Sequence, residues 1–201
     1  RGLGDVYKRQ EKSFLGVNYI IDLEIVNDEN LWVASDQGVL KINTMTDNIM
    51  RFSKSDSLPE SRRLSDNLIH DILPIDDKVW VATGSGVVII DTSSNNVTNF
   101  SSDLIARVIT QDEDGDIWLG TEMDGLYRIP SELLTNIING QNFEIEGYVF
   151  DADYPNGISS SQITCISQDK NGMIWIGTNG GLNQYSKDCL LYTSPSPRDA
   201  T

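Results

Sequence analysis

The sequence predicts an all-β protein, a β-propeller of about four four-stranded blades that form an incomplete arc of a larger ring. Two observations lead to this fold class. A motif of about a dozen residues occurs four times, at the spacing of four-stranded propeller blades. Between the copies, short runs of apolar, β-branched and aromatic residues alternate with Gly, Asn and Asp turns, which is typical of antiparallel strands and not of helical repeats.

The repeated motif is clearest at Ile174–Tyr185. A tryptophan is followed two places later by Ala or Gly and then by Ser or Thr, and a Gly opens the next apolar run after a short loop. Successive tryptophans lie 48, 38 and 57 residues apart, and a four-stranded blade takes about 40 to 50 residues. The repeated structural residues are Trp32, Trp80, Trp118 and Trp175, together with Gly38, Gly86, Gly125 and Gly181.

Each unit is interpreted as four short antiparallel strands. The first strand ends in an Asp-rich turn such as Asp112–Gly115 and leads by a tight hairpin into the tryptophan strand. The blades are expected at about residues 14–53, 66–100, 104–150 and 162–188. An insertion after Pro130, with about one helical turn, lengthens the third unit, and the fourth is expected to be cut before its last strand.

The tryptophan and the small residue two places later share one face of a strand, because strand side chains alternate. We therefore expect each tryptophan to pack against the neighbouring blade where Ala or Gly leaves room. The opposite face carries Ile, Val and Leu, as in a sheet that is covered on both faces. Cys165 falls on a first strand and is expected to be a small core residue.

The two ends of the chain do not fit the repeat. Residues 1–10 and 189–201 resemble translated sequencing-adapter fragments, so the propeller is assigned to residues 11–188. The 201-residue chain has a net charge of −15, which disfavours nucleic acid and acidic membrane headgroups and favours a neutral or cationic partner. No apolar run reaches 18 residues, so no membrane span is expected in this piece.

The order of short strand, Asp turn, IWIGT, Gly-Gly-Leu and Tyr in Ile163–Tyr185, and again in Val108–Ile129, resembles the two-component regulator propeller repeat. The resemblance covers most of Ile20–Tyr185, although the first two copies have Ala in place of Gly. It implies seven-bladed propellers, usually two in tandem, in the periplasmic sensor region of an inner-membrane hybrid two-component histidine kinase. It also implies a glycan-fragment ligand and, as partners, the rest of the propeller, a downstream kinase and a second copy of the parent.

No catalytic constellation is visible, and neither a cofactor nor a metal is expected. His70 is the only histidine, and one imidazole cannot build a zinc site. The turn Asp112–Asp116 suggests a calcium loop, but Ile117 stands where that loop needs Gly, so a hairpin turn is favoured. Gly84–Gly86 lacks the outer Gly of a nucleophile elbow, and the glycosylation-like triplet at Asn96 is interpreted as a turn and strand.

A ligand site is expected on the propeller face where the loops between second and third strands lie beside the connections between blades. The long connection after the third blade adds aromatic residues, including Phe150, that could stack on a sugar ring, although ordinary turn and strand roles remain open. The candidate ligand-binding residues are Tyr148, Asp151, Tyr154, Asp124 and Asn179.

Three functions follow in order of preference. The first is a non-catalytic, ligand-sensing and signal-transducing propeller segment of a hybrid two-component sensor kinase. The second is a propeller enzyme, a lyase or glycosidase, which would need paired carboxylates or a His base on one face. The third is a protein-interaction scaffold.

Overall fold

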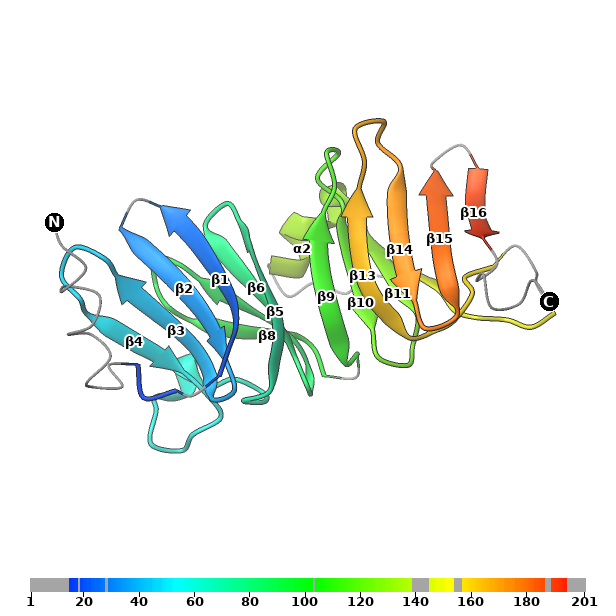
Figure 1. The fold of residues 1–201 in the computed structure, drawn as a ribbon. Helices are drawn as coiled ribbons and strands as arrows, with labels where there is room; N and C mark the ends of the chain where they lie inside the picture. The colour runs from blue at the N-terminus through cyan, green and yellow to red at the C-terminus, as the bar shows by residue number, and fades with distance from the viewer. Residues whose placement is uncertain are drawn as a thin grey trace, which may run out of the picture.

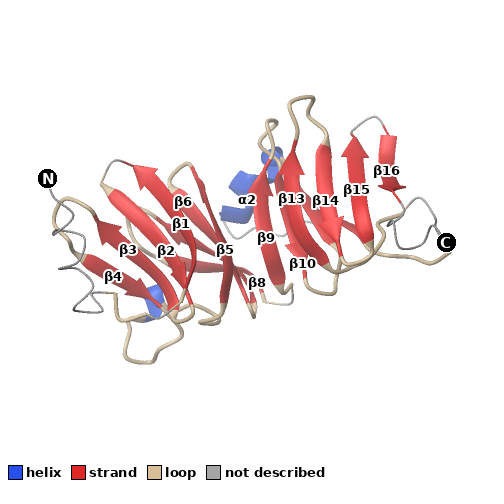
Figure 2. Ribbon diagram, viewed as in Figure 1, coloured by secondary structure: helices blue, strands red, loops and turns tan. Residues whose placement is uncertain are grey.

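The computed structural model of the chain describes residues 15–17, 19–27, 29–102, 104–138, 145–153, 157–186 and 189–194. The strands form four separate four-stranded antiparallel sheets, and in each sheet neighbouring strands follow one another in the chain (Figures 1 and 2). The predicted all-β propeller arc of four blades is therefore confirmed.

Each blade is one sheet. Blade one contains β1 (Ile20–Asn27), β2 (Asn30–Ser35), β3 (Gly38–Asn43) and β4 (Ile49–Phe52), and blade two contains β5 (Ile69–Ile75), β6 (Lys78–Thr83), β7 (Gly86–Asp91) and β8 (Val97–Ser101). Blade three contains β9 (Ala106–Gln111), β10 (Ile117–Thr121), β11 (Leu126–Ile129) and β12 (Glu146–Tyr148), and blade four contains β13 (Ile163–Gln168), β14 (Ile174–Thr178), β15 (Gly181–Ser186) and β16 (Cys189–Ser194).

Among the described residues, helical structure lies in connections between strands. The short helix η1 (Glu60–Arg62) lies between blades one and two, and η2 (Ser131–Leu133) followed by α2 (Leu134–Ile138) forms the predicted helical turn after Pro130. Ile137 of α2 is buried in the core between blades two and three. Within the part of the chain that the structure describes, no helix is long and apolar enough to cross a membrane.

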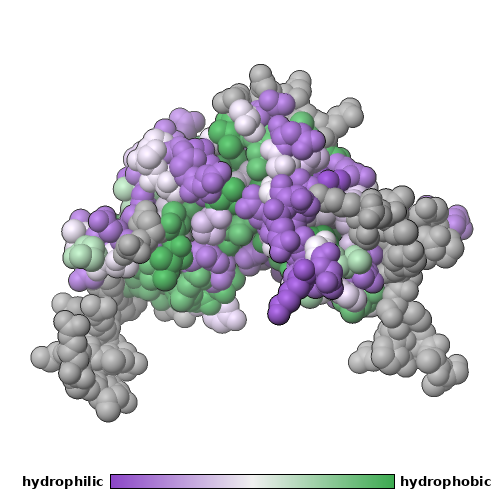
Figure 3. All heavy atoms as spheres, turned by 90° about the horizontal axis from the view of Figure 1, so that it is seen from above, coloured by the Kyte–Doolittle hydropathy of each residue, from purple (hydrophilic) through white to green (hydrophobic). Residues whose placement is uncertain are grey.

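The first strands of the blades form the inner side of the arc. β1, β5, β9 and β13 contact one another in that order, and each sheet extends outward from them (Figure 1). Seen from above, the molecule is an open arch and not a closed ring (Figure 3). The first strands therefore line the space that would become the central channel of a propeller.

The core lies between successive blades, as the tryptophan hypothesis requires. Trp32 shares a buried cluster with residues of blade two, Trp80 with residues of blade three, and Trp118 with residues of blade four. All three side chains are buried. The small residue is needed because a Cβ on Gly120 would lie 2.5 Å from Cγ2 of Ile163 in the next blade.

Cys165 is expected to be a core residue, but its side chain is exposed. It lies on the same face of blade four as Gly177, with which it is paired, and a Cβ on Gly177 would lie 2.5 Å from its Sγ. In blades one to three the equivalent face is covered by the following blade. Within the described residues no blade follows blade four, and Leu182 is 45% exposed there.

The last strand of blade four also differs from the expectation. The sequence predicts that blade four ends before its fourth strand, but β16 pairs with β15 from Leu182↔Ser194 to Ser186↔Cys189. The outer edge of β15 offers unpaired backbone groups, and the apolar and β-branched segment Cys189–Ser194 can add to that edge. Any segment of this composition could pair in this way, so the pairing does not test the origin of the segment. The adapter-like origin of residues 189–201 stays a prediction.

The repeated Gly and hydroxyl residues close the hairpin between the second and third strands. Gly38, Gly86 and Gly125 have φ values of 106°, 108° and 86°, and a Cβ on each would lie about 2 Å from a carbonyl oxygen of the fourth strand or its end. The hydroxyl before each loop donates a hydrogen bond to the carbonyl of that Gly. The pairs are Ser35 and Gly38, Thr83 and Gly86, Thr121 and Gly125, and Thr178 and Gly181.

Candidate functional site

The loops between second and third strands share one face with the connections that enter the blades, as predicted. In every blade a backbone N–H of the loop donates to a carbonyl of the connection, over 2.8 to 3.1 Å. The donor and acceptor residues are Asp36 and Tyr19, Gly84 and Leu68, Glu122 and Ile105, and Asn179 and Gln162. This face, defined by these four contacts, is called the loop face below.

A cavity of about 390 Å³ opens on the loop face where blades two, three and four converge. Blade two contributes one residue from β5, and blade three contributes residues from β9 and the β10–β11 loop. Blade four contributes residues from β13, from the connection that enters it and from the β14–β15 loop. The lining residues are His70, Arg107, Glu122, Gln162, Ile163, Thr164 and Asn179. All of them except Ile163 are polar, so the cavity, called the channel-mouth cavity below, is suited to a polar ligand.

The charges in the channel-mouth cavity are balanced. Arg107 Nη2 donates to Glu122 Oε1 over 2.6 Å, and the two side chains are 41% and 39% exposed. Burial, followed by the nearby charge of Arg107, lowers the pKa of His70 below its ordinary value of 6.5, so the imidazole is uncharged at neutral pH. A ligand therefore meets one guanidinium–carboxylate pair and a neutral ring, with no excess charge from these three groups.

The remaining lining residues add neutral hydrogen-bonding groups. Asn179 Nδ2 donates to Gln162 Oε1, which fixes the orientation of both amides across the cavity wall. Thr164 is exposed on β13 and supplies a hydroxyl, while the buried Ile163 beside it supplies an apolar wall. The arrangement offers donors and acceptors side by side, which hydroxyl groups of a ligand can use in pairs.

The structure brings only one of the predicted ligand residues into this cavity. Asn179 lines the cavity, whereas Asp124 is exposed in the β10–β11 loop, where its backbone N–H donates to Thr121 Oγ1. Asp151 is exposed and accepts a hydrogen bond from the backbone of Asp153. Tyr154 lies outside the described residues.

Tyr148 has a packing role in the structure. Its ring makes an edge contact with Tyr185 at a centroid distance of 5.6 Å, within the core between blades three and four. Burial raises the pKa of its hydroxyl above the ordinary value. Phe150, two residues later, is 51% exposed, and its backbone N–H donates to Ser161 Oγ beside the cavity residue Gln162. Among the described residues of this connection, Phe150 is thus an aromatic residue that lies on the surface.

Sequence reasoning did not identify Arg107, Glu122, Gln162 and Thr164, and it gave His70 little weight as a functional residue. These residues come from three different blades and have no shared sequence pattern. The signal that could have found them is their place in the repeat, because each lies just before or within a first strand or in the loop after a tryptophan strand.

The acidic turn before Trp118 is a hairpin, as favoured from the sequence. Asp112 accepts hydrogen bonds from the backbone of Asp114 and Asp116 and, through Oδ2, from Trp118 Nε1 over 2.9 Å. Asp116 accepts two hydrogen bonds from Arg128. Both carboxylates are thus used internally, and among the described residues no group of three or more His, Cys, Asp or Glu could hold a metal ion.

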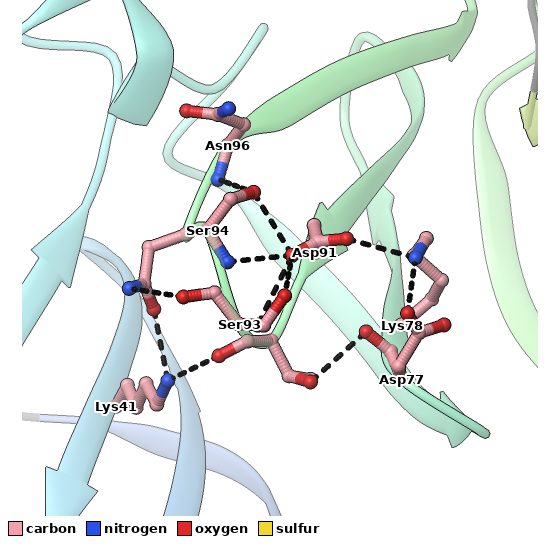
Figure 4. A network of polar contacts seen from close by, with 9 residues as sticks. Lys41, Asp77, Lys78, Asp91, Ser93, Ser94 and Asn96 are labelled. Atoms are coloured by element: carbon pink, nitrogen blue, oxygen red, sulfur yellow. Dashed lines mark hydrogen bonds and ion pairs between the residues drawn. The ribbon is translucent and has the colours of Figure 1, made fainter.

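A second cavity, of about 260 Å³, lies at the β7–β8 turn of blade two and is lined in part by Lys78, Asp91 and Asn96. Figure 4 shows that Asp91 is the centre of a polar network. Its carboxylate accepts hydrogen bonds from Lys78, Ser93 and Ser94, and the ion pair with Lys78 is the main reason why its pKa lies well below the ordinary value. Because the carboxylate is fully engaged by the protein, this network is structural.

The fold and its loop-face cavity define a β-propeller. The model of the two component regulator propeller family matches residues 93–123 and 157–180. These segments, which include the tryptophan strands of blades three and four, are two-component regulator propeller repeats. The prediction of this repeat is therefore confirmed.

Solved structures with the same fold include extracellular domains of two-component systems and an enzyme. The extracellular domain of BT4673 from B. thetaiotaomicron, assigned to a hybrid two-component system, has a TM-score of 0.70 at 17% identity and is matched over 88% of this chain and 25% of its own. The corresponding domain of BT3049 from the same organism gives 0.65 at 19% identity, over 91% and 25%. An ancestral GH74 enzyme gives 0.64 at 14% identity, over 92% and 25%.

The chain spans about a quarter of the length of each of these three structures. At identities below 20%, the likeness shows the fold alone. Among curated proteins, none matches the chain in sequence.

Proposed function

We propose that the chain is a non-catalytic segment of a hybrid two-component sensor kinase that binds a neutral glycan fragment on its loop face. The two-component regulator propeller repeats and the extracellular domains that share the fold support a sensing role. We also propose that the segment lies in the periplasm and that its parent is anchored in the inner membrane, and the extracellular placement of the similar domains supports this location.

The observation that carries this proposal is the balance of charge in the channel-mouth cavity. Sugar hydroxyls both donate and accept hydrogen bonds, so a site for them needs both kinds of partner without a dominant charge. The Arg107–Glu122 pair presents donors and an acceptor 2.6 Å apart, and the Gln162–Asn179 amides add further groups. An anionic ligand would have to compete with Glu122 for Arg107.

The position of the cavity suggests how occupancy becomes a signal. His70 lies in blade two, Arg107 in blade three and Thr164 in blade four, so one ligand touches three blades at once. A ligand that contacts all three favours the blade spacing in which it fits best, and it shifts the population toward that arrangement. The shift reaches the downstream kinase through the contacts between blades.

The alternative of a propeller enzyme draws on the likeness to the GH74 enzyme fold. Glycoside hydrolysis commonly uses two carboxyl groups on opposite sides of the scissile bond. Among the described residues that line the channel-mouth cavity, Glu122 is the one carboxylate, and it is held by Arg107. This arrangement supports binding over hydrolysis in this segment.

Isothermal titration with a panel of neutral oligosaccharides tests the proposal. Gln162→Ala removes an amide from the cavity wall, and we expect a loss of affinity of about threefold to tenfold, the value of one neutral hydrogen bond. Gln37→Ala is the matched control, because Gln37 lies in the loop of blade one outside the cavity and should bind like the wild type. The proposal fails if no oligosaccharide binds, or if both variants bind alike.

A further inference from the structure

The first strand of every blade contains an irregularity at the same place. In the pairing with the second strand, one residue near the start of each first strand has no Cα partner, which marks a β-bulge. The unpaired residues are Ile21 in β1, His70 in β5, Arg107 in β9 and Thr164 in β13. These four residues are called the bulge residues below.

A bulge turns a side chain away from the ordinary alternation of a strand, and bulges are frequent beside functional sites. Three of the four bulge residues, His70, Arg107 and Thr164, line the channel-mouth cavity. The repeated bulge thus explains why side chains from three blades converge on one cavity.

The backbone on each side of the bulge is fixed by the core. In β5, Ile69 and Ile72 are 1% and 2% exposed, and in β13, Ile163 and Ile166 are 3% and 9% exposed. Thr164, between the last two, is exposed. A change of side chain at a bulge therefore alters the cavity while the flanking core holds the strand in place.

The chemistry of the bulge residues differs from blade to blade, although the surrounding unit is repeated. The tryptophan and the hairpin Gly are identical in all four blades, whereas the bulge residues are aliphatic, imidazole, guanidinium and hydroxyl. The backbone geometry at this position is constant whereas the side chain varies, so the fold does not require a particular side chain there. The side chain is free to be adjusted to a ligand.

We propose that the bulge residues His70, Arg107 and Thr164 are specificity-determining positions of this propeller, and that blades two, three and four each recognise one part of the ligand through the bulge. The inference rests on the proposed function at the same cavity and assigns its selectivity. Arg107, paired with Glu122, reads two adjacent hydroxyl groups, Thr164 reads one more, and the neutral His70 reads a third part of the ligand. The ligand class is an uncharged oligosaccharide selected by its hydroxyl pattern.

A change of charge at one bulge tests the assignment. Thr164→Lys places a cation in the cavity, and Ser167→Lys is the control, because Ser167 is exposed on the same strand but does not line the cavity. The probes are neutral xylo-oligosaccharides and acidic oligogalacturonides, titrated against each variant and the wild type. We expect Thr164→Lys to raise the ratio of acidic to neutral affinity by about tenfold or more, as a new charge-assisted hydrogen bond should.

The outcomes separate the two proposals. A wild type that binds neither probe set nor any neutral oligosaccharide contradicts the proposed function and this inference together. If the wild type binds, two results overturn the bulge assignment alone. Either Thr164→Lys leaves the ratio of acidic to neutral affinity unchanged, or Ser167→Lys raises that ratio as much as Thr164→Lys does. Thr164→Val is the conservative second variant if the lysine impairs folding, and it should weaken neutral oligosaccharides by about threefold to tenfold without changing the melting temperature.

Discussion

Blades one and three each place a cationic side chain beside the tryptophan, but the two cations bind partners in different blades. Lys41 pairs with Trp32 on neighbouring strands of blade one, and Arg128 pairs with Trp118 in the same manner in blade three. Both cations lie over the tryptophan ring, at 5.4 and 5.9 Å from its centroid. The lysine then reaches into blade two, whereas the arginine turns back to its own blade.

The contacts of the two cations show the difference. Lys41 Nζ donates to the carbonyl of Thr92 and to Asn95 Oδ1 in the β7–β8 turn of blade two (Figure 4). Arg128 donates twice to Asp116 Oδ2, at 2.8 and 2.6 Å, in the turn before its own tryptophan strand. Lys41 thus ties blade one to blade two, whereas Arg128 ties two parts of blade three together.

The tryptophans follow the same division. Trp118 and Trp175 donate their indole N–H to Asp112 and Asp169 of their own turns, over 2.9 and 3.0 Å. Trp32 Nε1 is buried and has no hydrogen-bond partner among the described residues. The comparison teaches that the Asp turn and the tryptophan of the repeat act within a blade, and both of these Asp–Trp pairs lie in the segments that the family model matches.

Loss of Arg128 should give the largest effect on stability. Arg128→Met leaves Asp116, 3% exposed, without its cation, and removing one partner of such a pair costs about 3 kcal/mol of unfolding free energy. Urea denaturation checks the value. Lys170→Met, at an exposed turn of blade four, is the control. An equal loss of unfolding free energy in both variants would contradict the within-blade role of Arg128.

The carboxyl group of Asp71 in blade two should make stability depend on pH. Burial, together with the nearby Asp22, raises the pKa of Asp71 to about 6, although the backbone of Ile109 in blade three donates to it. Between pH of about 4 and 6 the folded protein then binds more protons than the unfolded chain, so stability falls as pH rises. Asp71→Asn should abolish this fall and gain about 2 kcal/mol at pH 7.

Urea denaturation at pH 4 and pH 7 measures the effect of Asp71→Asn. Val108 and Cys165 occupy the place of Asp71 in blades three and four, so Val108→Thr serves as a control that should leave the pH dependence unchanged. An unaltered fall between the two pH values in Asp71→Asn would show that another group titrates in this range.

Matched changes at two tryptophans test the division more finely. Trp118→Phe leaves Oδ2 of the buried Asp112 without its indole donor, whereas Trp32→Phe removes an N–H that has no partner. Both lose comparable packing, so we expect Trp118→Phe to cost about 1 to 2 kcal/mol more in unfolding free energy. Equal costs in denaturant titrations would mean that the Asp112 hydrogen bond contributes little.

The smallest effect is expected from Lys41. Lys41→Met keeps an aliphatic side chain over Trp32 and removes two hydrogen bonds to blade two, a loss of about 1 kcal/mol. Hydrogen exchange should show the change at the backbone amides of the β7–β8 turn and not in blade three. Uniform loss of protection across the arc would contradict a local tie between blades one and two.

Much of the fold could be predicted because its determinants repeat. Trp, small residue, hydroxyl and Gly recur in all four units, and the structure shows a contact that requires each of them. The last strand and Cys165 could not be predicted, because both depend on what lies beside the outer face and edge of blade four. Sequence periodicity contains no information on such neighbours.

The candidate site was harder to predict for a related reason. A β-bulge depends on the register between two strands, and nothing in the letters around Arg107 or Thr164 marks the residue that lacks a partner. Tyr148 shows a second difficulty, because an aromatic residue at the end of a strand is consistent with either a surface or a core position. Only the packing of Tyr185 from blade four identifies it as core.

The most direct measurement is a crystal structure of the chain with the neutral oligosaccharide that binds it most tightly. The account predicts that the ligand occupies the channel-mouth cavity, with hydroxyl groups in hydrogen-bond contact with Arg107, Glu122 and Thr164. A ligand bound only elsewhere, with these three side chains arranged as in the free protein, would contradict it.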